Sequence, residues 1–208
     1  SGPVFTSATG GSSITTDGDY KIHTFNTGAD FVVTTLGEDD QTVQYLVVAG
    51  GASGGGGGLI GASHAGGGGG GAGGYRTATG FSISADTTYT ITVGAGGARL
   101  NVANTNGNPG LDSVFSSITS LKGGAGHGTY SYGSATGGSG GGQGSRINYG
   151  GAGSNNPGVG TAGQGNDGGE GAEPDGAGGG GGAGAVGGNA PSGTSGGVGG
   201  AGTASSIT

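Results

Sequence analysis

Three histidines are the side chains best suited to metal or acid–base chemistry, and they lie far apart in the sequence. His23 falls in a β-branched run, His64 in a glycine block and His127 in a glycine-rich loop. Metal-binding histidines usually follow a short fixed spacing, such as H-E-x-x-H on a helix, and no such spacing occurs here. We therefore predict no metal site and no cofactor, and we interpret His23 as an ordinary strand residue.

The many serines and glycines form no catalytic motif. A nucleophilic serine in G-x-S-x-G needs a strand before it and an α-helix after it, and the sequence offers no such helix. Matches to G-x-G-x-x-G are frequent in so glycine-rich a chain, and a dinucleotide site also needs a following helix. We therefore predict that the protein is not an enzyme.

Four carboxylates lie close together in the sequence: Asp167, Glu170, Glu173 and Asp175. Ca²⁺ prefers carboxylate oxygens, and residues 163–170 faintly resemble a calcium-binding β-roll repeat. The motif occurs once and lacks the alternating apolar position. Solvated loop acids are the favoured interpretation, and a calcium site near Asp167 and Asp175 stays open.

Aromatic and polar side chains isolated within glycine are the features most suggestive of binding. Tyr combines a large contact area with a polar tip at low entropic cost, which suits recognition loops. We predict ligand-binding residues in two such islands, which are His127, Tyr130 and Tyr132, and Arg146, Asn148 and Tyr149. A third island holds Leu59, Ile60 and His64. The alternative, that these residues pack on the glycine segments or cap their ends, stays open.

The composition limits both the fold and the partners. Glycine supplies 64 of 208 residues, against about 7% in ordinary proteins, and ordering glycine costs more backbone entropy than ordering any other residue. The glycine segments are therefore either a flexible linker or an array that needs glycine for close packing. A net charge of −7 with five Lys and Arg disfavours nucleic acid as a partner, and no apolar run predicts membrane insertion.

The elements that would position these residues are strands and extended glycine segments. β-Branched and aromatic residues with a period of two predict strands within residues 4–50, 76–93 and 113–121, with residues 114–121 as one strand and 94–112 as a loop. No stretch is amphipathic with a helical period, and each interior glycine costs an α-helix about 1 kcal/mol relative to Ala. We therefore predict no α-helix.

The register of the glycines favours an ordered array. Counting in triplets, the first position is glycine at 178, 181, 184, 187, 193, 196, 199 and 202, and fails only at Ala190. A left-handed helix with three residues per turn turns every third residue toward the same neighbour. Collagen is excluded because it needs abundant Pro and this chain has five. We predict packed polyglycine II segments within residues 50–74 and 123–204, and the flexible linker remains the alternative.

The last of these segments are expected to form two rods. Residues 176–188 and 192–202 would each span roughly 30–40 Å at about 3.1 Å per residue. A turn at residues 189–192, which contain Pro191, would join them.

An ordered set of motifs resembles the glycine-rich domain of bacteriophage tail fibres and related adhesins. The motifs are residues 19–25, 45–51, 73–77, 89–97, 113–118 and 199–202. The resemblance implies one domain over residues 1–208 that is mainly β, with a small β-sandwich carrying a bundle of polyglycine II helices. Domains of this family usually continue past residues 205–208 into another glycine block, and this sequence departs from that pattern. A truncation, or a variant completed by a neighbouring subunit, would account for the departure.

The resemblance implies a non-enzymatic receptor-binding module, on a virion surface or extracellular, that attaches to a bacterial surface glycan or outer-membrane protein. The alternative is a structural subunit that assembles with copies of itself into a filament or virion sheath, and a homo-oligomer is expected. A flat polyglycine array that binds ice is a third interpretation.

Overall fold

The β-branched and aromatic residues of the first half of the chain form short antiparallel strands. The computed structural model describes residues 5–38, 41–60, 63–129, 131, 133, 135–145 and 156–207. The larger sheet has the order β1 (Ser7–Thr9), β4 (Ala29–Thr35), β9 (Thr87–Thr92), β10 (Ser113–Phe115) and β11 (Ile118–Ser120). Two-stranded sheets are β2 (Ser13–Asp17) with β3 (Tyr20–Thr24), β5 (Thr42–Val48) with β8 (Tyr75–Ser82), and β6 (Gly58–Ile60) with β7 (Ser63–Ala65). Within these described residues there is no α-helix, which confirms the mainly β fold class.

One apolar cluster joins the larger sheet to the β5–β8 pair. Its buried members are Phe31 and Val33 of β4, Val47 of β5, Ile83 just after β8, and Phe115 of β10. Because both sheets turn apolar side chains toward this single core, they form a small β-sandwich. His23 lies on β3 beside this cluster, as predicted for a strand residue, with its ring 5.1 Å from that of Phe31.

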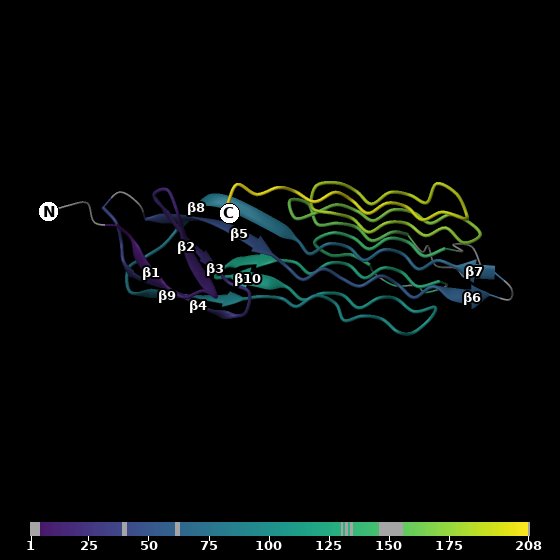
Figure 1. Cartoon of the computed structure of the whole chain (residues 1–208), viewed down its shortest axis with the longest axis horizontal. Coiled ribbons are helices and arrows are strands. Elements are labelled where there is room, and N and C mark those ends of the chain that lie inside the picture. The colour runs from purple at the N-terminus through teal and green to yellow at the C-terminus, as the bar shows by residue number, and fades with distance from the viewer. Residues whose placement is uncertain are drawn as a thin grey trace.

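The glycine-rich segments extend away from the sandwich as a bundle of extended backbones. Strand β1 and the end of the yellow C-terminal segment lie at the sandwich end, whereas the β6–β7 hairpin lies at the opposite end (Figure 1). We call this opposite end the distal tip. Between the two ends, backbone N–H groups donate across segments, for example from Gly71 to the carbonyl of Gly124 at 2.8 Å. These inter-segment bonds are the pattern of packed polyglycine II helices.

Close packing explains the glycine register over most of its length. An ideal Cβ at Gly178, Gly181 or Gly187 would lie 1.9–2.2 Å from a carbonyl oxygen of a neighbouring segment. No real side chain tolerates such a contact, so glycine is required there. Close packing does not explain the glycines of the last segment, because a Cβ at Gly199 or Gly202 would have no atom within 4 Å.

Three sequence-based expectations about the course of the chain are wrong. Residues 176–188 are not one rod, because the Gly182 N–H donates to the Ala185 carbonyl and the chain reverses there. Residues 94–112 are not a simple loop, because they run along the bundle, with Leu111 accepting a hydrogen bond from the Gly50 N–H. Residues 114–121 are a hairpin, broken where Ser116 takes a φ of 52°.

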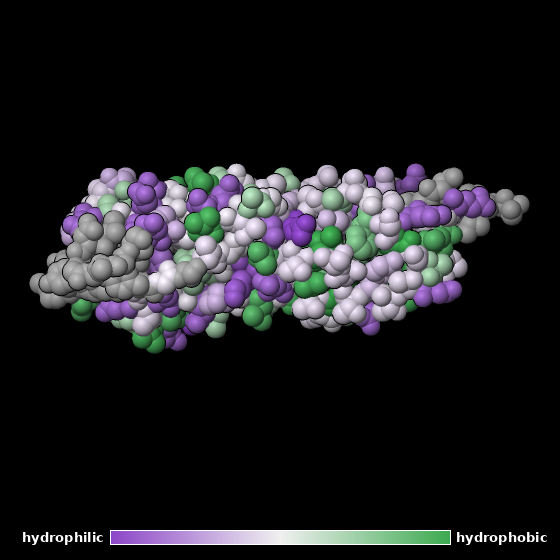
Figure 2. Space-filling view, turned by 180° about the vertical axis from the view of Figure 1, so that it is seen from behind, coloured by the Kyte–Doolittle hydropathy of each residue, from purple (hydrophilic) through white to green (hydrophobic). Residues whose placement is uncertain are grey.

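The surface of the molecule is mixed. In the view of Figure 2, hydrophobic residues form separate patches among near-white glycine-rich surface and not one continuous apolar face. No helix in the described ranges has the length and apolarity to cross a membrane.

Replacing a packed glycine should destabilise the bundle. A Cβ at Gly124 would lie 1.7 Å from the Ala135 carbonyl oxygen, so we expect Gly124→Ala to lower the free energy of unfolding by about 1–3 kcal/mol or more. The matched control is Gly202→Ala, where the added methyl meets no atom, and its expected change is within about 0.5 kcal/mol. Urea unfolding measures both, and equal effects would contradict a close-packed bundle.

Candidate functional site

The distal tip is built from the β6–β7 hairpin and the turn at residues 101–105. The hairpin pairs Leu59 with His64 in antiparallel register. In the turn, Asn104 adopts a φ of 57°, a left-handed conformation that Asn tolerates better than most residues. The Ser131 hydroxyl donates to the Asn104 carbonyl at 2.6 Å, and the Asn104 N–H donates to the Gly56 carbonyl at 3.1 Å. These bonds fix the turn against the bundle.

Apolar side chains are exposed around a shallow hollow at this tip. Leu59 is 65% exposed and Val102 is 58% exposed. The hollow has a volume of about 630 Å³, and it is lined by Gly57, Gly58, Leu59, His64, Ala65, Ala103 and Asn104. The tip therefore offers exposed apolar surface beside an imidazole and an amide, which together can pack on a partner and hydrogen-bond to it.

The structure places His127 inside the bundle and not at the tip surface. Its side chain is 1% exposed, and its Nε2 lies 2.9 Å from the Gly133 carbonyl oxygen. Nδ1 is buried without a hydrogen-bond partner. This placement favours packing over ligand contact, because a receptor could reach the imidazole only if the bundle opened.

The other predicted ligand-binding residues lie outside the described residues. They are Tyr130, Tyr132, Arg146, Asn148 and Tyr149, and their role in binding stays a prediction. Of the third island, the structure brings Leu59 and His64 together at the hollow.

Sequence reasoning missed Val102 and Asn104 as surface features of the tip. Both lie in the Asn- and Gly-rich stretch that was expected to be a loop. The one sequence feature that could have indicated this surface is Val102, an apolar residue in a polar stretch that lacks the alternation of a β-strand. Only the bundle shows that this stretch folds back beside the β6–β7 hairpin.

The acidic stretch forms hydrogen bonds within the bundle. An Asp167 carboxylate oxygen accepts from the Gly160 N–H at 2.7 Å, and Glu173 is exposed. Among the side chains that the structure describes, no group of three His, Cys, Asp or Glu is arranged to hold a metal ion.

Comparison with known proteins gives one match. A family model described as a glycine-rich domain matches residues 26–208. No curated protein and no solved structure matches the chain.

Removing the buried imidazole should destabilise the protein. His127 is buried within the bundle and His127→Ala would leave a cavity there, so we expect a loss of about 2–4 kcal/mol in the free energy of unfolding. His64→Ala is the matched control, because His64 is exposed, and its change should stay within about 0.5 kcal/mol. Chemical denaturation measures both variants. A His127→Ala protein as stable as the wild type would refute the structural role.

Proposed function

This chain belongs to the glycine-rich domain family, and we propose that it is a non-enzymatic receptor-binding module of a phage tail fibre. In this proposal it is displayed on the virion surface, an extracellular location, and attaches to a bacterial surface glycan or outer-membrane protein. The motifs that resemble tail-fibre domains, over residues 19–25, 45–51 and 89–97 among others, support the assignment to a fibre.

The placement of the exposed apolar side chains at the distal tip is the observation that favours binding there. Strand β1 and the end of the C-terminal segment lie at the sandwich end, and the distal tip lies at the opposite end of the molecule (Figure 1). Leu59 and Val102 are exposed at that end, and neither belongs to the apolar core of the sandwich. Solvent-exposed apolar groups beside polar ones are common at recognition surfaces.

Rigidity supports the same proposal. The tip is joined to the sandwich by segments whose backbones bond to one another repeatedly, for example Gly55 N–H to the Gly68 carbonyl and Gly56 N–H to the Thr105 carbonyl. A surface that is ordered before binding loses less entropy when it meets its partner. The net charge of −7 also directs the proposal toward a glycan or protein and away from nucleic acid.

A second candidate is a structural subunit that assembles with copies of itself into a filament or sheath. The edge segment 193–203 favours it. Val198 is 76% exposed there, and the N–H groups of Gly196 and Gly199 donate no hydrogen bond to any residue in the described ranges. Unpaired backbone edges are sites where another chain can add.

Binding to cells tests the proposed tip. Fluorescently labelled protein is titrated against a panel of bacterial strains, and Leu59→Asp with Val102→Asp is then tested on any strain that binds the wild type. We expect binding to weaken at least about tenfold, which corresponds to about 1.4 kcal/mol, because charges replace the apolar contact. Val186→Asp is the control, since Val186 is 60% exposed on the bundle away from the tip. Equal losses in both variants would contradict a binding site at the tip.

The mass of the protein in solution separates the two candidates. A receptor-binding module should give discrete particles whose mass does not grow with concentration. Regular filaments seen by negative-stain electron microscopy, with no cell binding on any strain, would favour the structural subunit.

A further inference from the structure

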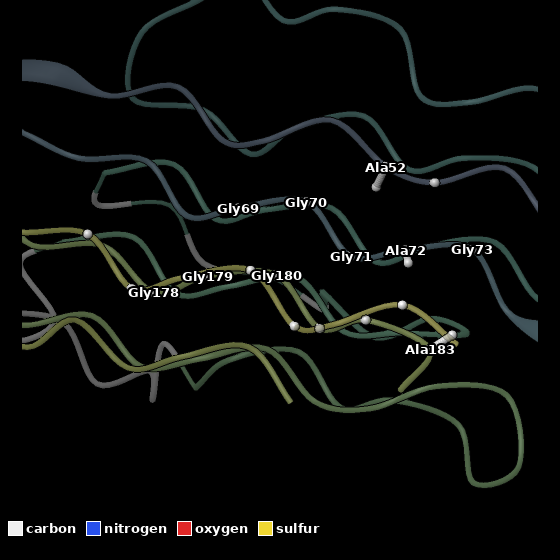
Figure 3. A pocket seen from close by; sticks show the side chains of 18 of the residues that line it. Ala52, Gly69, Gly70, Gly71, Ala72, Gly73, Gly178, Gly179, Gly180 and Ala183 are labelled. Carbon is white, nitrogen blue, oxygen red and sulfur yellow. The ribbon is translucent and has the colours of Figure 1, made fainter. Parts of the chain in front are cut away.

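A long groove runs along one side of the bundle, away from the distal hollow. Its volume is about 1140 Å³, and it is lined mainly by segments 66–73, 177–183 and 194–203. Figure 3 shows residues 69–73 running beside residues 178–183 along this groove. We call 177–183 the floor, 66–73 the first wall and 194–203 the second wall.

The floor has one row of backbone N–H groups that have no partner among the described residues. The N–H groups of Gly178, Gly179, Gly181 and Gly182 donate to the carbonyls of Gln143, Gly188, Gly140 and Ala185. Those of Ala177, Gly180 and Ala183 donate no hydrogen bond to any residue that the structure describes. Ala177 is only 8% exposed and Gly180 is also buried. Buried backbone N–H groups without partners are rare in native proteins.

These unpaired N–H groups point into the groove. The N–H of Gly180 shares a planar peptide with the Gly179 carbonyl, which accepts from Gly169. In a trans peptide the N–H and C=O point in opposite directions, so this N–H points away from the segment that contains Gly169. The Gly182 carbonyl accepts from Asn166, and the Ala183 N–H therefore points the same way. That direction lies between the two walls.

The first wall presents a matching row of carbonyls. The N–H groups of Gly68, Gly71 and Gly74 donate to the 121–128 segment, at His127, Gly124 and Leu121. By the same peptide geometry, the carbonyls of Gly67, Gly70 and Gly73 point away from that segment and toward the groove. None of these three carbonyls accepts a hydrogen bond from a described residue.

The second wall adds an independent observation. Gly196, Gly199 and Gly202 line the groove, yet a Cβ at Gly196 would meet its first neighbouring atom only at 3.7 Å and one at Gly199 or Gly202 would meet none. On the outer face of the same segment, Val198 carries a side chain. Glycine is less favourable than Ala in ordered structure, because it loses more backbone entropy on folding. Its presence along the open row is explained if something packs closely there.

Segment 177–183 is hydrogen-bonded on every other side. Its bonded neighbours are segments 66–73, 139–145, 164–170, 184–190 and 193–203. The groove is therefore one position in a lattice of polyglycine II helices that none of the described segments occupies. A strand placed in it would accept from the floor row and donate to the carbonyls of the first wall.

We propose that this groove is an assembly site that receives one polyglycine II strand, with glycine at every third position, from a polypeptide segment outside residues 1–208. The floor of the groove is about 19 Å long from Ala177 to Ala183, at about 3.1 Å per residue. A bound strand of about seven residues would therefore fill the groove. One residue in three turns its Cα toward the floor and must be glycine. The edge segment 193–203 of a second copy does not fit, because Val198 stands on its outer face, 76% exposed.

Peptide binding to the 208-residue chain tests the proposal. The probe is a fluorescein-labelled peptide of four Gly-Ser-Asn repeats, followed by fluorescence anisotropy, and the matched peptide has four Ala-Ser-Asn repeats. We expect saturable binding of the glycine peptide and binding at least about tenfold weaker for the alanine peptide.

Two variants of the chain place the binding in the groove. Gly199 lines the groove, and a Cβ added there has no atom of the chain within 4 Å. We therefore expect Gly199→Val to keep the fold and to abolish peptide binding. Val198→Ala, on the outer face, should bind the peptide as the wild type does. Thermal unfolding checks that both variants remain folded.

Three outcomes would overturn the proposal. One is no binding of the glycine peptide up to millimolar concentration. Another is equal binding of the two peptides, or binding that Gly199→Val leaves unchanged. The third is self-association of the chain, without peptide, that Gly199→Val abolishes, because this would make the occupant a second copy. None of these readouts involves the distal tip, so they do not depend on cell binding.

Discussion

The backbone hydrogen bond between adjacent extended segments is the interaction on which this structure depends. Among the described residues the apolar core lies in the sandwich, and the segments of the bundle are joined by bonds such as Gly71 N–H to the Gly124 carbonyl. These bonds form only where two backbones approach closely, and the approach leaves no room for a Cβ, as at Gly124 and Gly178. Glycine content, extended conformation and the small number of large side chains all follow from this one requirement. The hydrophobic core of the sandwich, around Phe31 and Phe115, anchors one end.

Much of the fold could be predicted because local sequence determines it. The period of two in residues 87–92 and 42–48 reflects side chains that alternate between core and solvent, and both are strands. Gly178 and Gly181 reflect contact with one neighbouring segment, because a Cβ at either position would meet the carbonyl oxygen of Gly169 or Asn166. The course of the chain was not predictable in the same way. Glycine permits a reversal wherever a hydrogen bond closes it, so nothing in residues 176–188 marks the turn at Ala185.

The candidate site was predictable only in part. Leu59 and His64 were identified because large residues are conspicuous within glycine, and they meet at the hollow. His127 was identified on the same ground, but its bonded ring lies within the bundle. Val102 and Asn104 join the tip through long-range pairing between residues 104 and 56, which no local pattern encodes. The open groove could not be predicted either, because the sequence does not distinguish a glycine that packs against a neighbouring segment from one that lines an open groove.

Amide hydrogen exchange, resolved by residue with NMR, tests the central claim most directly. Inter-segment bonding predicts two slow amides followed by one fast amide along residues 66–74, with Gly67, Gly70 and Gly73 exchanging quickly and their neighbours slowly. Hydrogen-bonded amides exchange only when the structure opens. We therefore expect the same alternation of slow and fast amide exchange along residues 177–183, with Ala177, Gly180 and Ala183 as the fast amides. Uniformly fast exchange across both segments would contradict the account and identify the glycine-rich region as a flexible linker.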